Sequence, residues 1–113
     1  MKKLLVLLTL MVAILLQFCT SSRKNQVVVP KVTYAANIQQ LVISNCSPCH
    51  IPPNNRKKPY DNYTAVKTDI DDILKRIQKS PTEDGFMPFK HPKLSDSTIN
   101  VFVKWKADGL LEK

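Results

Sequence analysis

Residues 46–50 read Cys-Ser-Pro-Cys-His, and this segment constrains the fold more than any other feature of the chain. Two thiols lie three positions apart, and a histidine follows the second thiol directly. One helical turn brings Cys46 and Cys49 to the same side of the backbone, with His50 next to them. This is the attachment pattern of c-type haem, in which each thiol forms a thioether to a vinyl group and the histidine binds the iron. The sequence therefore predicts one covalently attached haem c.

The N-terminus has the pattern of an export signal. Lys2 and Lys3 precede a fifteen-residue apolar run, residues 4–18, that is broken only by Thr9 and Gln17. Such a run is typical of a signal peptide and is shorter than the ~20 residues of a membrane-spanning helix. Because haem is attached to such motifs outside the cytoplasm, we expect an extracytoplasmic, periplasmic protein.

Cys19 stands at the end of the apolar run. The segment Leu16-Gln17-Phe18-Cys19 resembles a bacterial lipoprotein box, with Cys19 as the lipidated residue. Phe18 departs from the pattern, which prefers a small residue there. Cleavage after residues 20–22 and an uncleaved N-terminal anchor therefore remain as alternatives to a lipid anchor at Cys19.

These features divide the chain into a signal peptide (residues 1–18), a polar tether (residues 19–32) and a domain (residues 33–113). Removal of the signal peptide leaves 95 of the 113 residues, which form one small domain that is poor in apolar core. A buried haem would supply the missing core. The net charge of +8 comes without a nucleic-acid motif, so it favours an acidic protein partner or an anionic membrane surface over nucleic acid. An ordinary solvated surface explains the charge equally well.

Apolar periodicity predicts three main helices and no strand, so we expect an all-α domain. The first helix begins after Thr33 as N-cap, runs into residues 46–50 and is stopped by Pro52 and Pro53. The second covers residues 63–77. Within it, Thr68-Asp69-Ile70-Asp71 resembles a capping box that starts a fresh helix.

The last helix begins after Ser95, has Asp96 in its first turn and terminates at Gly109. Lys106 falls on its apolar side, so we expect this side chain to extend past the core to solvent. The apolar positions at helical spacing in the first two helices are Tyr34, Ile38, Leu41, Val42, Tyr63, Val66, Ile70, Ile73, Leu74 and Ile77. Those of the last helix that we expect to be buried are Ile99, Phe102, Val103 and Trp105.

The haem motif and the three helices occur in the order of the class I cytochromes c, and the chain resembles this family over residues 33–110. The resemblance implies that the first and last helices cross near the haem. The family has a glycine at this crossing. Here only Ala35, Ala36 or Ser44 would take its place.

The resemblance also implies a methionine ligand to the iron after the second helix. Met87, in Gly85-Phe86-Met87-Pro88-Phe89, is the only methionine outside the signal peptide. A thioether ligand favours ferrous iron and raises the reduction potential. We expect Met87 to be this distal ligand. The alternatives are a Met87 that fills a gap in the core, and ligation by His91.

Two groups of side chains are expected around the haem. The aromatic and apolar candidates for packing against it are Tyr60, Phe86, Phe89, Leu94 and Trp105. The basic candidates for a ring around its exposed edge, which would attract acidic redox partners, are Arg56, Lys57, Lys58, Lys90 and Lys93.

The resemblance implies an electron carrier that is not an enzyme: one electron moves between extracytoplasmic redox proteins, with no small-molecule substrate. Within haem chemistry, the alternative is a ligand-binding or sensing domain in which Met87 is displaced from the iron. Two alternatives without haem are a zinc site built from Cys46, Cys49, His50 and His91 and a thiol redox pair of the two cysteines.

Overall fold

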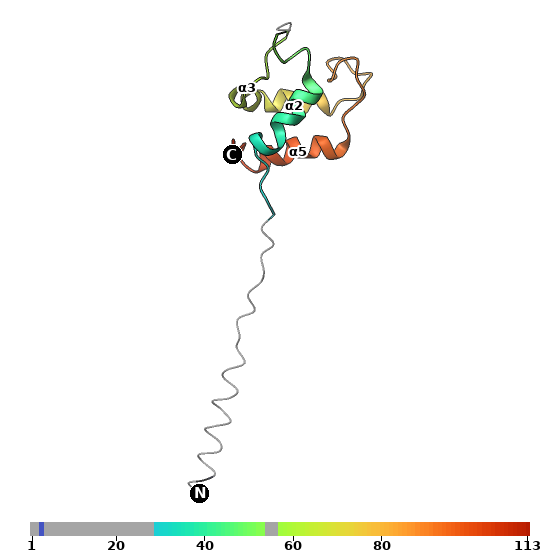
Figure 1. Ribbon diagram of the computed structural model, residues 1–113. Coiled ribbons are helices and arrows are strands. Elements are labelled where there is room, and N and C mark those ends of the chain that lie inside the picture. Colours follow the sequence, from blue (N-terminus) through green and yellow to red (C-terminus); the bar gives the residue numbers. More distant parts are fainter. Residues whose placement is uncertain (1–2, 4–28, 54–56) are drawn as a thin grey trace.

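The computed structural model describes Lys3, residues 29–53 and residues 57–113. The expected signal peptide, Cys19 and most of the expected tether lie outside the described residues, as does Arg56. The helices of the described part are η2 (Tyr34–Ile38, a π-helix), α2 (Gln39–Cys46), α3 (Tyr63–Thr68), α4 (Ile70–Ile77) and α5 (Asp96–Ala107) (Figure 1). This part of the chain forms no strand, as predicted, and its one extended pairing is an isolated bridge between Thr33 and Leu111.

The first helix begins as predicted and ends earlier than predicted. The Thr33 hydroxyl caps it by accepting a hydrogen bond from the Ala36 N–H at 3.3 Å. After the π-helical turn of η2, α2 ends at Cys46 because Ser47 is extended. The following Pro48 disfavours the helical conformation at Ser47. The predicted continuation of this helix through the Cys-His motif to Pro52 was therefore wrong.

The second predicted helix is two helices joined at Asp69. The Asn62 side chain caps α3 by accepting a hydrogen bond from the Ala65 N–H at 2.9 Å. A fresh helix does begin at Ile70, but the expected capping box is not formed, because Thr68 ends α3 and its hydroxyl donates to the Thr64 carbonyl at 2.8 Å. The apolar stripe of α4 is buried, as predicted, through Ile70, Ile73, Leu74 and Ile77.

Both predicted ends of α5 are confirmed. The Ser95 hydroxyl caps its first turn. At the other end Gly109 has a φ of 96°, a conformation that glycine adopts without the strain a Cβ would bring. The N–H of Gly109 bonds to the Lys106 carbonyl and that of Leu110 to the Trp105 carbonyl, at 3.2 and 3.0 Å. This pair of bonds is a Schellman motif.

One predicted core residue of α5 is not in the core. Phe102 and Trp105 are buried as expected, whereas Val103 is 40% exposed. Lys106 extends to solvent, as predicted, and its ammonium pairs with Asp71 of α4 at 2.5 Å. The buried face of α5 is therefore narrower than the apolar pattern indicated, and its edge is lined by an ion pair with the neighbouring helix.

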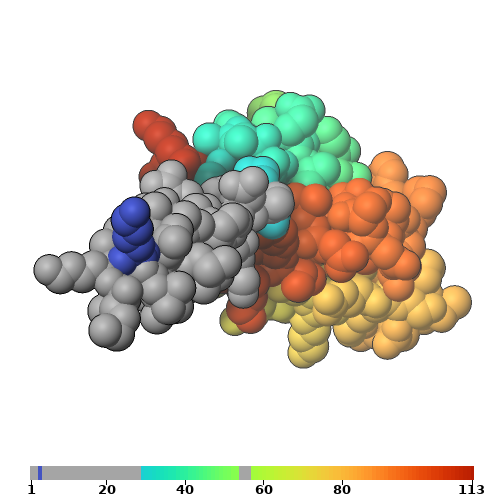
Figure 2. Space-filling model, turned by 90° about the horizontal axis from the view of Figure 1, so that it is seen from below, coloured from blue at the N-terminus to red at the C-terminus, as the bar shows by residue number. Residues whose placement is uncertain are grey.

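The crossing of the first and last helices is built on aromatic packing. Trp105 is fully buried, and its ring centroid lies 6.1 Å from that of Tyr34 and 6.3 Å from that of Tyr63. Seen from below, α5 lies between the segment of η2 and α2 and the segment of α4 (Figure 2). The residues expected to form a small-residue crossing, which are all exposed, are Ala35, Ala36 and Ser44. That prediction was wrong, since large rings fill the contact.

One residue of the expected tether packs with the helices. Val32, the last residue of the expected tether, is buried and belongs to the core cluster. Val29, three residues before it, is 63% exposed. Val32 is therefore part of the hydrophobic core of the described residues.

Candidate functional site

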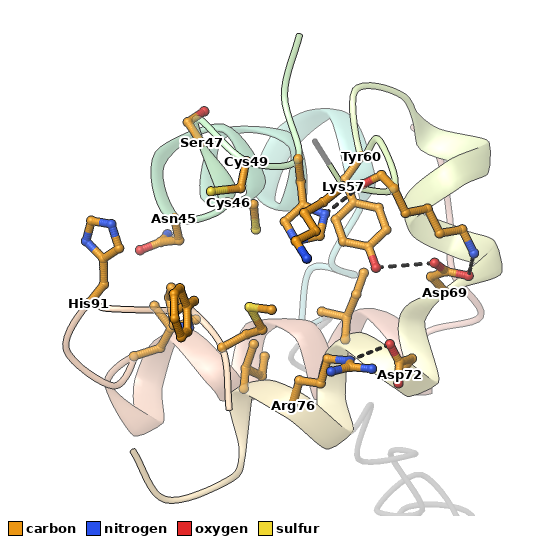
Figure 3. A pocket seen from close by; sticks show the side chains of 18 of the residues that line it. Asn45, Cys46, Ser47, Cys49, Lys57, Tyr60, Asp69, Asp72, Arg76 and His91 are labelled. Atoms are coloured by element: carbon orange, nitrogen blue, oxygen red, sulfur yellow. Dashed lines mark hydrogen bonds and ion pairs between the residues drawn. The ribbon is translucent and has the colours of Figure 1, made fainter. Parts of the chain in front are cut away.

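A cavity of about 720 Å³ lies beside the end of α2, α4 and the segment between α4 and α5 (Figure 3). Its size is within the range of ~300–1,000 Å³ that is typical of ligand sites. The apolar side chains that line it are Ile73, Ile77, Met87, Pro88, Phe89, Leu94 and Phe102. The polar and sulfur-containing ones are Asn45, Cys46, Ser47, Cys49, His50, Lys57, Lys58, Tyr60, Asp69, Asp72, Arg76 and His91. All four residues expected to hold haem, Cys46, Cys49, His50 and Met87, line this one cavity.

The Cys-His motif forms a turn directly after α2, and one further backbone hydrogen bond connects this turn to the end of the helix. Cys46 is the last residue of α2, and the N–H of His50 bonds to its carbonyl at 3.0 Å. The hydroxyl of Ser47 donates to the Ile43 carbonyl at 2.7 Å and so satisfies one of the last carbonyls of the helix. One backbone hydrogen bond thus closes the turn that contains both cysteines, although the helix has ended.

The two cysteines differ in their surroundings. Both are free thiols; Cys49 is exposed, whereas Cys46 is half-buried and directed into the cavity (Figure 3). Burial raises the pKa of Cys46 to about 11, because the thiolate loses hydration. The two thiols therefore differ in their access to solvent, and Cys49 is the more accessible one.

His50 has one ring nitrogen committed to a hydrogen bond. Its Nδ1 lies 2.7 Å from the carbonyl oxygen of Lys58. Because a carbonyl only accepts, Nδ1 must carry the proton and donate it. In the neutral imidazole, Nε2 is then unprotonated and is the nitrogen able to bind a metal. A hydrogen bond from the other nitrogen to a backbone carbonyl is the usual support of a metal-binding histidine.

The segment that supports His50 is itself held by Asp69. The ring of Tyr60 stacks on the imidazole, with centroids 4.6 Å apart and planes 9° apart. The Tyr60 hydroxyl donates to the Asp69 carboxylate at 3.2 Å, and the Lys58 ammonium forms an ion pair with the same carboxylate (Figure 3). Burial, followed by the nearby charge of Asp69, raises the pKa of Tyr60, so this phenol stays protonated and donates. Sequence patterns assigned Asp69 only to a helix start and missed this role.

Met87 reaches the cavity from a loop that is fastened to α4. Its N–H bonds to the Arg76 carbonyl at 3.3 Å, and the Arg76 guanidinium lies 3.4 Å from the Gly85 carbonyl. Gly85 has a φ of 78°, and a Cβ there would lie 3.2 Å from Arg76 Nη1. Phe86 is buried next to it. The half-buried Met87 thioether is the second candidate iron ligand in the cavity, beside His50.

His91 also lines the cavity, at its periphery. Its side chain is exposed, and it lies at the end of the cavity away from Asp69 (Figure 3). Its N–H bonds to the Pro88 carbonyl at 3.2 Å, which folds the loop after Met87 into a turn. No side-chain hydrogen bond orients its imidazole in the described residues. This contrasts with His50, whose ring is held on one nitrogen and one face.

The structure separates the expected packing residues into two groups. Tyr60, Phe89 and Leu94 line the cavity. Phe86 and Trp105 do not, although both are buried. Trp105 packs with tyrosine rings in the core, and its Nε1–H donates to the Leu111 carbonyl at 2.9 Å. The structure therefore does not place these two side chains at the cavity.

Two further cavity residues, Asp72 and Arg76, were missed by the sequence analysis. Arg76 Nε donates to Asp72 at 2.7 Å, one turn apart on α4, and this bond holds the pKa of Asp72 below its usual range. The signal was present in the sequence, since both lie at helical spacing beside the apolar stripe of α4. Both side chains are more than 40% exposed, so the pair contributes little to stability.

The basic side chains expected around the cavity are only partly gathered there. Lys57 and Lys58 line it. Lys90 and Lys93 are exposed on the loop after Met87 and are not among its lining residues. Lys58 is paired with Asp69, so its charge is already compensated. Among the described residues, three exposed cations at the cavity or on the neighbouring loop have no carboxylate partner: Lys57, Lys90 and Lys93.

Residues 29–53 and 57–113 contain no group of three His, Cys, Asp or Glu side chains that could hold a metal ion. The proposed zinc set of Cys46, Cys49, His50 and His91 is therefore not assembled as a cluster. No helix in the described part of the chain has the length and apolar character needed to span a membrane.

Comparison of the chain with protein-family models, with characterised proteins and with solved structures found no match.

Proposed function

We propose that this chain is an extracytoplasmic electron carrier that binds one haem covalently through Cys46 and Cys49, with His50 and Met87 as iron ligands. The observation that carries the proposal is the hydrogen bond from His50 Nδ1 to the Lys58 carbonyl at 2.7 Å. It leaves Nε2 free for a metal, in a cavity that also contains two thiols at haem-attachment spacing and a thioether. These four side chains are sufficient to attach a haem and to bind its iron.

The residues of the cavity fit such a group chemically. Apolar side chains from α4, α5 and the Met87 loop supply an apolar wall, and the half-buried Cys46 thiol lies at the end of α2 beside it. When bound, haem supplies an iron that is reduced and reoxidised by one electron. Cys46 and Cys49 would hold the haem covalently, and His50 and Met87 would both bind its iron, which would leave no iron position for a substrate. On this proposal the protein is not an enzyme.

The location and partners follow from the same proposal. Haem attachment of this type requires export, and the expected lipid at Cys19 would keep the domain at a membrane. The partners would be redox proteins that approach the cavity mouth, where Phe89 is 64% exposed and Lys57 and Lys90 are also exposed. Acidic partners would be attracted by these cations. Neither a nucleic acid nor a small-molecule substrate enters this proposal.

The deciding experiment is an absorption spectrum of the full chain after coexpression with haem-attachment machinery. Haem that remains bound after denaturation establishes thioether attachment. A weak long-wavelength sulfur-to-iron band in the refolded, oxidised protein establishes Met87 as ligand. Absence of covalent haem would overturn the proposal.

Carbon monoxide separates the carrier from a haem-based sensor. A reduced iron with two firmly bound protein ligands takes up carbon monoxide slowly, whereas a displaceable Met87 leaves an open position. Rapid binding by the native, reduced protein would replace the electron-carrier proposal with a ligand-binding one. Mass spectrometry of the mature chain tests the lipid at Cys19 separately, because a lipidated N-terminus has a distinct mass.

A further inference from the structure

The short segment of residues 58–60 contacts His50 through two opposed hydrogen bonds. His50 Nδ1–H donates to the Lys58 carbonyl at 2.7 Å, and the Tyr60 N–H donates back to the His50 carbonyl at 2.8 Å. The Tyr60 ring also stacks on the imidazole at 4.6 Å. The direction of the His50 ring is therefore set by the position of this segment.

This segment has no regular secondary structure of its own. Its side chains converge instead on one carboxylate: the Lys58 ammonium and the Tyr60 hydroxyl both bond to Asp69, the hydroxyl at 3.2 Å. The carboxylate of Asp69 is only 13% exposed. Its two oxygens are divided between the two partners, so Asp69 holds both residues at once.

Backbone hydrogen bonds to both neighbouring helices, α3 and α4, hold Asp69 in place. Its N–H bonds to the Ala65 carbonyl of α3 at 3.3 Å, and its carbonyl accepts from the Ile73 N–H of α4 at 2.9 Å. Ile73 is itself buried. The Asp69 carboxylate therefore connects the junction of α3 and α4 to residues 58–60, the irregular segment that contacts the His50 imidazole.

We propose that Asp69 is a positioning residue for His50, acting through Lys58 and Tyr60 to keep Nδ1–H bonded and Nε2 directed into the cavity. This inference rests on the proposed function, since its purpose is to orient an iron ligand. Hydrogen bonding of the outer nitrogen raises the basicity of a metal-bound imidazole and fixes its orientation.

Three variants of the haem-loaded full chain separate the contributions of Asp69, Lys58 and Tyr60 to the position of His50. Asp69→Ala removes both bonds, Lys58→Met removes the ion pair and keeps the backbone carbonyl, and Tyr60→Phe removes the hydroxyl and keeps the stacked ring. The matched control is Asp71→Ala, two residues along. Asp71 is 76% exposed, pairs with Lys106 and does not line the cavity. Asp71→Ala therefore removes an aspartate and its ion pair but no contact with His50.

The first readout is the exchange rate of the His50 Nδ1 proton with solvent, followed by NMR in the reduced protein. Loosening of residues 58–60 exposes this proton, so we expect exchange to be faster by about tenfold in Asp69→Ala. Tyr60→Phe and Lys58→Met should each give a smaller increase, and Asp71→Ala should match the wild type.

The second readout is the midpoint potential of Tyr60→Phe, a substitution that changes no charge. A weaker hydrogen bond at Nδ1 makes the imidazole a poorer donor to ferric iron, so the potential should rise. A rise together with faster exchange supports positioning.

Exchange in Tyr60→Phe and Lys58→Met that equals the wild-type rate would overturn the inference, whether or not Asp69→Ala folds. Failure of the proposed function has a different signature: the wild type itself would contain no covalent haem.

Discussion

The carboxylate of Asp108 accepts a hydrogen bond from the backbone N–H of Val32 at 2.6 Å, across 76 positions of sequence. The same carboxylate pairs with Lys104 at 2.9 Å and is 15% exposed. Asp108 is the C-cap of α5, where the helix dipole disfavours a negative charge. The bond from Val32 and the Lys104 ammonium offset this cost, and they fasten the start of the domain to the end of its last helix.

Asp108→Asn is expected to lower the thermal midpoint by several degrees. The hydrogen bond from Val32, and then that from Lys104, hold the pKa of Asp108 below its usual range. A lowered pKa in the folded state means that the stabilisation is fully present above the unfolded carboxyl pKa of about 4. It is lost as the pH falls below that value. The difference in stability between wild type and variant should therefore be constant near neutral pH and shrink in acid.

Thermal unfolding at several pH values measures this. Asp84→Asn is the matched control, because this aspartate is exposed and its side chain makes no ion pair in the described residues. An equal shift in both variants would contradict the role of Asp108.

Removal of the two thiols should abolish covalent haem. Cys46→Ser and Cys49→Ser each leave one thioether, so haem should stay attached at reduced yield, and the double variant should release all haem on denaturation. Haem staining of a denaturing gel measures attachment. Ser47→Ala, between the two cysteines, is the control and should retain haem. Full retention in the double variant would refute attachment at this motif.

Met87→Ala should eliminate the sulfur-to-iron band and allow rapid binding of carbon monoxide to the reduced protein. Both effects follow from loss of the only thioether in the cavity. His91→Ala should change neither property, because its exposed imidazole lies at the periphery of the cavity. Spectra of the two variants compare the rival ligands directly; loss of the band only in His91→Ala would reverse the assignment.

Two glycine variants should separate backbone strain from ligand placement. Gly109→Ala meets no atom within 4 Å, so its cost is the positive φ alone, about 1 kcal/mol of unfolding free energy. Gly85→Ala adds a Cβ contact of 3.2 Å with Arg76 to a similar φ, so it should cost more and disturb the contact of the guanidinium with the Gly85 carbonyl, which helps to hold the Met87 loop. Denaturant titration gives the stabilities. The sulfur-to-iron band should weaken only in Gly85→Ala. Equal bands in both variants would show that Gly85 does not help to place Met87.

Reversal of the charges at Lys57 and Lys90 should slow electron exchange with an acidic redox protein at low salt. The effect should shrink at high salt, where exposed charges are screened. Lys113→Glu makes the same kind of charge change at the C-terminus and is the control. Stopped-flow mixing measures the rates. Identical rates for all variants at low salt would exclude these two lysines from partner docking.

Local patterns in the sequence predicted much of the fold. The caps at Thr33 and Ser95 and the stop at Gly109 depend on side-chain or backbone chemistry within a few residues. The apolar stripe of α4 was likewise identified from its spacing. Such features can be recognised in sequence because one helical turn contains all the groups that determine them. The end of α2 was the exception, since the effect of Pro48 on Ser47 outweighed the expected continuation.

The residue types of the candidate site, Cys46, Cys49, His50 and Met87, were also recognised from sequence alone. Their gathering around one cavity depended on the tertiary structure. So did the hydrogen bond of His50 to Lys58, the link to Asp69 and the exclusion of Trp105 from the cavity wall. These features depend on contacts between segments that are far apart in the sequence, so no local sequence pattern could predict them. A side chain at a helix junction has several possible partners, and only the packing of the helices decides which one it meets.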